Sequence, residues 1–164
     1  MIEPSKVNAA AIEREEENLK FRRFLKSRAD EDELDRQFLE LHNELFLGYD
    51  CCKCNNCCRA YDTSVREEEV DSIAAFLGLT RQDFTERYLT QTIEGYEIKA
   101  PCCFLNEDGT CAIQACKPAE CKEFPHTDKP DRMGSLLGIV SFAEECPVVY
   151  EILERLKKIY HFKT

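Results

Sequence analysis

Five cysteines lie within the eight residues from Cys51 to Cys58, in the order CCKCNNCC. Two cysteines separated by two residues can hold one metal ion, because the intervening residues curl the backbone until both sulfurs converge. Cys51 and Cys54 have this spacing, and Cys54 and Cys57 repeat it. One loop rarely closes a tetrahedral site alone, so we expect further ligands from distant parts of the chain.

The chain has 11 cysteines, an odd number that argues against a scaffold built only from disulfides. The N-terminus lacks a charged segment followed by an apolar one, and no segment approaches the length of a membrane span, so we expect a soluble cytoplasmic protein without membrane contact. Thiols stay reduced in the cytoplasm. The cysteines therefore indicate metal binding or redox catalysis before disulfide formation.

Four cysteines beyond the loop lie near turns or helix ends, where backbone donors and loop freedom favour ligation. Together with the loop they give eight predicted metal ligands: Cys51, Cys54, Cys57, Cys58, Cys102, Cys111, Cys121 and Cys146. Eight thiolates suffice for two ions with four ligands each. Neighbouring side chains diverge, so we expect Cys57 and Cys58 to serve different centres. Cys52, Cys103 and Cys116 are predicted to be non-ligands.

Thiolate ligands select zinc or iron, including iron-sulfur clusters, and argue against magnesium and calcium, which prefer oxygen. The sequence leaves the choice between zinc and iron open. The formal net charge is -10, and no long basic stripe offsets it. Nucleic acid is therefore not an expected partner, because a phosphate backbone would be repelled.

The expected fold is α+β: a mostly helical small domain with a cysteine-rich loop and a short β-hairpin organised around metal. Helical spacing of apolar residues predicts helices over residues 6–27 and 31–47, and a last helix after Pro147. These patterns suggest an N-terminal helical arm, residues 1–47, and a cysteine-cluster metal-binding domain, residues 48–164. The first helix contains no cysteine or histidine, so it is a candidate for docking a protein partner or for dimerisation.

The hairpin is expected to start at Tyr96 and to turn at residues 106–109, where Asn, Glu, Asp and Gly follow one another. If Leu105 lies opposite Thr110, Cys102 shares a face with Cys111. A loop one residue longer or shorter would put Cys103 there instead. A capping box is expected to start a helix at Thr63 or Ser64, and Thr80 to start another.

The motifs beyond the loop follow a definite order. They are Pro101-Cys102-x-Phe104-Leu105, Asp108-Gly109-x-Cys111-x-Ile113, Lys117-Pro118-x-x-Cys121-x-x-Phe124-Pro125 and Cys146-Pro147. With the loop, this series resembles the CxxCxxCC family of zinc- or iron-chelating proteins, the YkgJ-like cysteine cluster proteins, from about residue 50 to 147. The resemblance implies the same eight cysteines as ligands. Lys117 stands where the family usually has arginine, and Gln114 where tyrosine is common.

Three functions remain open. The first is a cytoplasmic metal-binding protein that holds two zinc ions, or iron, in thiolate sites. The second is an iron-sulfur redox or methyl-transfer enzyme related to flagellin lysine N-methylases, which resemble the family only over the cysteine region. The third is a thiol redox switch that uses the unassigned cysteines. No phosphate-binding loop, dinucleotide-binding motif or nucleophile elbow is present, and the sequence does not decide whether the protein is an enzyme.

Overall fold

A computed structural model describes residues 1–163 of the chain, and residue 164 lies outside the described part. The chain divides into two compact units. The helical unit comprises residues 1–49 and 125–163, and the cysteine unit comprises residues 50–124. The division suggested by the sequence, at residues 47 and 48, groups the C-terminal segment with the cysteine loop. In the structure the C-terminal segment instead belongs to the same compact unit as the N-terminal helices.

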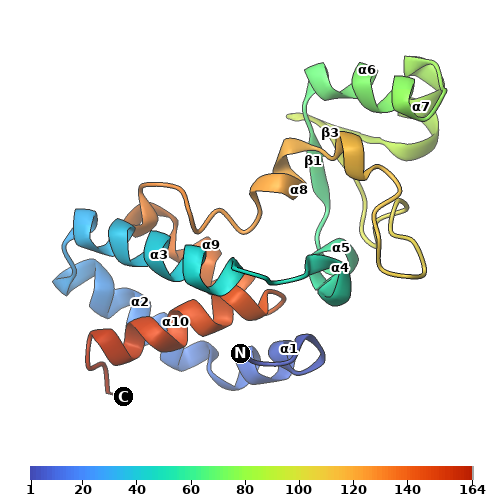
Figure 1. Ribbon diagram of the computed structural model, residues 1–164. Helices are drawn as coiled ribbons and strands as arrows, with labels where there is room; N and C mark the ends of the chain where they lie inside the picture. The colour runs from blue at the N-terminus through green and yellow to red at the C-terminus, as the bar shows by residue number, and fades with distance from the viewer. Residues whose placement is uncertain (164) are drawn as a thin grey trace. The chain divides into compact units, whose positions relative to one another are not determined.

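Five helices build the helical unit (Figure 1). They are α1 (Pro4–Glu13), α2 (Glu15–Arg28), α3 (Glu31–Phe46), α9 (Arg132–Phe142) and α10 (Pro147–Ile159). Helix α9 contacts α2, α3 and α10, while α1 contacts α2 and α10. The largest fully buried side chains come from several of these helices and include Phe21, Phe38, Leu136 and Ile152. The core of this unit therefore joins segments from both ends of the chain.

The N-terminal helical segment is part of that core. The single helix expected over residues 6–27 is divided at Arg14, where the backbone leaves helical geometry (φ -104°, ψ 8°). Val7 and Leu25 are completely buried, and Phe21 is 1% exposed. The apolar stripe of this segment, although narrow, is covered by the rest of the helical unit.

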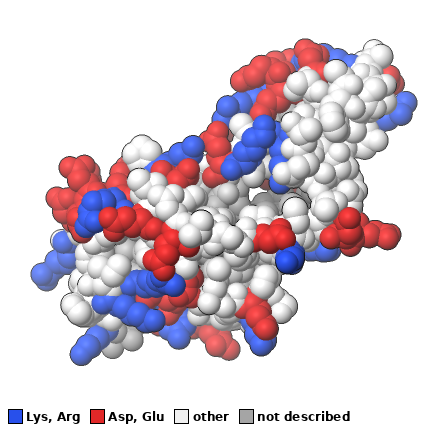
Figure 2. All heavy atoms as spheres, viewed as in Figure 1, with Lys and Arg blue, Asp and Glu red and all other residues white. Residues whose placement is uncertain are grey.

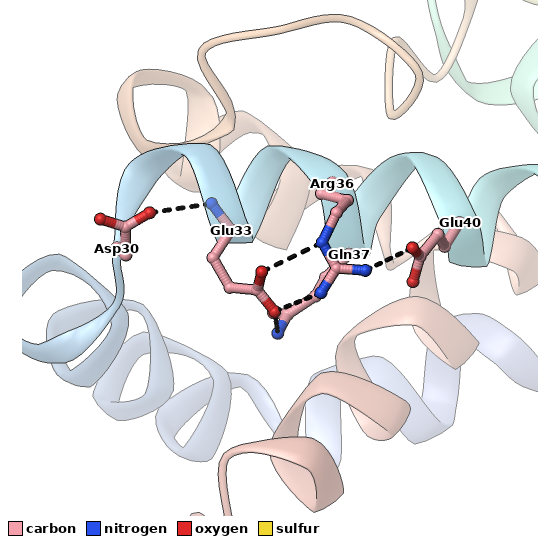
Figure 3. Close-up of polar contacts among 5 residues, drawn as sticks. All are labelled: Asp30, Glu33, Arg36, Gln37 and Glu40. Atoms are coloured by element: carbon pink, nitrogen blue, oxygen red, sulfur yellow. Dashed lines mark hydrogen bonds and ion pairs between the residues drawn. The ribbon is translucent and has the colours of Figure 1, made fainter.

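Helix α3 matches the helix expected over residues 31–47 to within a residue. Asp30 caps it by accepting a hydrogen bond from the Glu33 amide at 3.0 Å (Figure 3). On its exposed face Arg36 binds the Glu33 carboxylate through Nε at 3.0 Å and Nη2 at 2.6 Å, and it also pairs with Glu40. Gly48 follows the helix with a positive φ of 75°, as expected for a residue that ends a helix.

The cysteine unit combines short helices with a small sheet. Its elements are α4 (Cys51–Cys54), α5 (Asn56–Ala60), β1 (Thr63–Val65), α6 (Glu67–Phe76), α7 (Arg81–Tyr88), β2 (Thr90–Thr92), β3 (Gly95–Ile98), the 3-10 helix η1 (Gln114–Cys116) and α8 (Ala119–Glu123). The strands form one antiparallel sheet in the order β1-β3-β2. Thr63 pairs with Ile98, and Gln91 pairs with Tyr96. The mostly helical α+β class is confirmed.

A separate hydrophobic core supports the cysteine unit. It contains Val65, Val70, Ile73, Ala74, Phe84, Ile98, Phe104 and Ile113. Thr80 caps α7 as expected, since its hydroxyl accepts from the Asp83 amide at 3.0 Å. The expected cap of the preceding helix is wrong, because Thr63 and Ser64 belong to strand β1. That helix starts at Glu67, and Glu69 closes its first turn by accepting from the Arg66 amide at 2.9 Å.

The hairpin expected over residues 96–113 does not form. Strand β3 ends at Ile98 and pairs with β1 and β2 instead. The turn at residues 106–109 is confirmed, with the Gly109 amide donating to the Asn106 carbonyl at 3.0 Å. Pairing around the turn is limited to an isolated bridge, which joins Leu105 to Cys111 rather than to Thr110, and to two hydrogen bonds. The Asn106 amide donates to the Thr110 carbonyl at 2.9 Å, and the Ala112 amide donates to the Phe104 carbonyl at 2.8 Å. Pro101 has no amide hydrogen for a ladder and Phe104 packs into the core, so this segment leaves the sheet.

Acidic and basic side chains are interspersed on the face of the molecule shown in Figure 2. The whole chain has 32 Asp and Glu against 22 Lys and Arg, which gives the net charge of -10. Over the described residues, the helices are too short or too polar for any of them to cross a bilayer.

Candidate metal centre

The cysteine loop folds as two short helical turns joined by a left-handed residue. Asp50 caps α4, and its carboxylate accepts from the Cys52 amide at 3.0 Å. Asn55 then adopts left-handed geometry (φ 58°, ψ 8°), which asparagine tolerates better than most residues. Its amide donates to the Cys51 carbonyl at 3.0 Å and closes the first turn. The reversal lets the chain restart as α5, so one short segment carries all five cysteines.

Asn55 also fixes the 106–109 turn against this loop. Its side-chain amide donates to the Gly109 carbonyl at 2.8 Å and to the Cys51 carbonyl at 3.3 Å. The asparagine is only 9% exposed, so these bonds are shielded from water. A Cβ atom at Gly109 would overlap the Cys52 carbonyl oxygen and would approach Asn55 Oδ1 to 2.8 Å. The two segments therefore meet backbone to backbone, at a spacing that glycine permits.

A second backbone contact brings Cys102 to the loop. The Cys102 amide donates to the Cys58 carbonyl at 2.8 Å. Just before it, the Asp62 carboxylate accepts from the Ala100 amide at 2.8 Å and from Lys99 Nζ at 2.7 Å. Asp62 thus holds residues 99–102 beside the end of the cysteine loop.

Cys121 reaches the same region from helix α8. This helix lies beside β1, and its first amide, that of Ala119, donates to Glu69 Oε1 at 2.7 Å. The Cys121 thiol donates to the Thr63 hydroxyl at the start of β1, with a sulfur-oxygen distance of 3.7 Å. Glu69 and Thr63 therefore fix this short helix and its cysteine from two sides.

The Cys58 sulfur lies within electrostatic range of Cys51, Cys102 and Cys121, and we call these four cysteines, which come from three segments, the thiol cluster. The pKa of the Cys121 thiol is raised to about 11, chiefly by burial, with the neighbouring sulfurs of Cys102 and Cys58 contributing. Burial likewise raises the pKa of Cys102, again with Cys58 contributing. For Cys51, burial raises the pKa first and the Cys54 thiol second.

Cys58 is the exception within the thiol cluster. A hydrogen bond from the Cys57 thiol, with smaller help from the positive charge of Lys117, lowers the pKa of Cys58 to about 6. Lys117 also acts on Cys51 and Cys121, where its charge opposes the effect of burial. One cation on the chain thus lies within range of three thiols of the cluster, although lysine replaces the arginine expected there from the resemblance.

The remaining predicted ligands are distributed differently. Cys54 lies on the same loop, and the Cys111 sulfur is near Cys102 and raises its pKa. Cys146 belongs to the helical unit, where it is 8% exposed at the start of α10. Within residues 1–163, no three Cys, His, Asp or Glu side chains are arranged so that they could hold one ion. The thiols gather without converging, and the set of eight ligands stays a prediction.

The donor chemistry of the thiol cluster nevertheless fits zinc or iron. The side-chain groups that act on these thiols are other sulfurs, the Thr63 hydroxyl and the cations Lys117 and Arg59, and backbone amides act on Cys58 and Cys102. Sulfur donors of this kind suit zinc and iron and do not suit magnesium or calcium. Binding an ion would require the sulfurs to move closer together than they lie in this structure.

Several residues that shape this region were not found from the sequence. Asn55, Gly109 and Thr63 connect the cysteine segments, and Asp62 and Glu69 hold the flanking chain. The residue types of Asn55 and Gly109, both tolerant of positive φ, were the only signal for the first contact. Of the predicted non-ligands, Cys103 is exposed, while Cys116 packs against the hydrophobic core as expected for a small apolar residue.

Comparison with known proteins gives one family. The family profile CxxCxxCC, described as "Putative zinc- or iron-chelating domain", matches residues 50–147, more than half of the chain. No curated protein and no solved structure matches this chain. The match starts at the cysteine loop and ends one residue after Cys146, so it includes all eight predicted ligands. The chain therefore belongs to the CxxCxxCC family.

Proposed function

We propose that the protein binds zinc or iron through cysteine thiolates, and that Cys51, Cys58, Cys102 and Cys121 form one centre. The observation that carries this proposal is the thiol cluster, in which Cys58 lies within electrostatic range of three thiols from the loop, from the segment carrying Cys102 and from helix α8. Membership of a family described as zinc- or iron-chelating supports the same chemistry.

The electrostatics of the thiol cluster explain why a cation would be favoured there. Burial raises the pKa values of Cys51, Cys102 and Cys121, so their thiolates are costly without a compensating positive charge. A zinc or iron ion supplies that charge and a preference for sulfur. Cys58, with its pKa lowered to about 6, would provide the first thiolate near neutral pH. The remaining thiols would lose their protons as the ion binds.

A closed site of four thiolates has a structural role rather than a catalytic one, because no coordination position stays open for a substrate. Such a site would tie the cysteine loop, the segment carrying Cys102 and helix α8 together. We further propose a second ion, for which Cys54, Cys57 and Cys111 are the remaining predicted ligands in the cysteine unit. Cys146 is a predicted ligand on sequence grounds alone. Reduced thiols are required, so the cytoplasm is the proposed location.

The test is elemental analysis and an absorption spectrum of protein purified without oxygen. About two zinc ions per chain and no visible absorption would support structural zinc sites. A brown protein with a broad visible band would support an iron-sulfur centre, and metal-free protein with reversible disulfides would support a thiol redox switch instead.

Two cysteine variants provide a matched comparison. Cys58→Ser should lower the metal content by about one ion per chain, because serine replaces a thiolate of the proposed centre by a poor ligand. Cys103→Ser should leave it unchanged, since this cysteine is an exposed predicted non-ligand. Full metal content in Cys58→Ser would refute the assignment of Cys58 to a centre.

A further inference from the structure

The Cys121 thiol has a polar contact with Thr63, a residue that is neither charged nor a predicted ligand. The thiol donates to the hydroxyl oxygen across 3.7 Å. Thr63 lies at the first ladder position of β1, opposite Ile98, so its backbone is fixed by the sheet. Helix α8, which carries Cys121, is fixed separately by the bond between Glu69 and the Ala119 amide. The sulfur and the hydroxyl are therefore held near each other by two independent anchors.

The hydrogen bond between Cys121 and Thr63 can persist when Cys121 loses its proton, as metal binding requires. A thiol can donate a hydrogen bond, whereas a thiolate can only accept one. A threonine hydroxyl can do either, because its hydrogen rotates about the C–O bond. When the Cys121 proton leaves to solvent, the Thr63 hydroxyl can turn its own hydrogen toward the sulfur. The contact then reverses direction without any movement of the backbone.

We propose that Thr63 is a positioning residue of the metal centre, whose hydroxyl donates to the Cys121 thiolate when an ion is bound. This inference rests on the proposed function. The hydrogen bond would hold the sulfur in the orientation needed for ligation and would draw electron density from it. Groups that hold metal ligands by hydrogen bonds typically change metal affinity 10- to 100-fold when they are removed.

Thr63→Val is the decisive variant, because valine keeps the shape and the β-branched character of threonine but has no hydroxyl. We expect its zinc affinity, measured by competition with a chromophoric chelator, to fall at least about tenfold. Thr63→Ser restores the hydroxyl and should bind zinc within about threefold of the wild-type chain. Thr90→Val, at an exposed position of strand β2, is the matched control and should bind as the wild type does.

Cobalt(II) provides a readout that simple packing would not change. In protein loaded with cobalt(II), the sulfur-to-metal charge-transfer band should shift in Thr63→Val and stay in place in Thr63→Ser and Thr90→Val. Wild-type zinc affinity and an unshifted band in Thr63→Val would overturn the inference while leaving the proposed function intact. Equal losses in Thr63→Val and Thr63→Ser would also overturn it, because the hydroxyl would then not be the active group. A wild-type chain that binds neither metal would refute the proposed function and this inference together.

Discussion

Substituting Gly109 by alanine tests the backbone contact that joins the 106–109 turn to the cysteine loop. Two effects lower the free energy of unfolding of this variant. Alanine at a φ of +86° is strained, by about 1 kcal/mol or more. The added Cβ also overlaps the Cys52 carbonyl oxygen, a backbone atom that cannot rotate away. The turn must therefore move, and the bond from Asn55 to the Gly109 carbonyl stretches or breaks.

The loss of that buried bond costs about 1–3 kcal/mol, because it leaves a polar group without its partner. Together with the strain we expect a destabilisation of about 2–4 kcal/mol, a large share of the stability of a small domain. The assay is denaturant unfolding followed by far-ultraviolet circular dichroism, since the chain contains no tryptophan for fluorescence. Zinc binding should weaken in parallel, because the turn precedes Cys111 and contacts the loop.

Gly78→Ala is the matched control. Gly78 has a similar positive φ of 69° in the same unit, but a Cβ there meets nothing within 4 Å. This variant should therefore lose only the strain energy of about 1 kcal/mol, and its zinc binding should not change. Equal destabilisation in the two alanine variants would show that the close approach of Gly109 to the loop does not exist in solution, and the reasoning would be wrong.

Three further predictions concern the two units and the metal. Deleting residues 1–28 removes the buried Val7, Phe21 and Leu25, worth about 6 kcal/mol in total, so circular dichroism should show that the helical unit unfolds. The cysteine unit should still bind metal, and complete loss of metal would contradict this. Burial lowers the pKa of His42 from 6.5, so the folded state prefers the neutral ring. The contribution of His42 to the free energy of unfolding should therefore be complete above about pH 6.5 and fall as the pH decreases. Denaturant midpoints measured in His42→Gln should not show this fall. Removing metal with a strong chelator should lower the thermal midpoint by several degrees without complete unfolding, because hydrophobic cores remain; an unchanged midpoint would refute a structural role for the ions.

Local sequence patterns predicted the helices better than the region around residues 101–113. Helix α3 was predictable because its start has a capping aspartate, its apolar residues repeat with helical spacing, and Gly48 follows it. The hairpin prediction failed because alternation and a turn motif do not reveal competing partners. Strand β3 pairs with β1, a segment more than thirty residues earlier whose sequence favours a helix cap. Burial of Phe104 then draws the chain away from the sheet.

Residue type and position predict a set of candidate ligands, but they do not predict which of these cysteines lie near one another. Spacing within the loop says that sulfurs can converge locally, whereas the approach of Cys102 and Cys121 depends on contacts between distant segments. Those contacts involve backbone amides, carboxylates and a hydroxyl, which have no distinctive sequence pattern. Cys146, assigned to the same set because it lies at a helix end, belongs to the helical unit.

The contacts that gather the thiol cluster also bear on how metal binding would couple to folding. Cys102 is held by its amide on the Cys58 carbonyl, and α8 by the Ala119 amide on Glu69, so neither placement uses a sulfur-metal bond. Asn55 and Gly109 add a buried hydrogen bond between the loop and the turn.

An ion that binds in this region would need to order side chains more than backbone. The conformational entropy lost per residue on metal binding is therefore smaller than in a chain whose backbone must also be ordered. In small zinc domains without a core, the ion contributes most of the folding free energy. Here a hydrophobic core around Ile73 and Phe84 and these polar contacts already support the chain. A partial loss of stability on metal removal is therefore the expected result, and complete unfolding would mean that these contacts are too weak to hold the cysteine segments together by themselves.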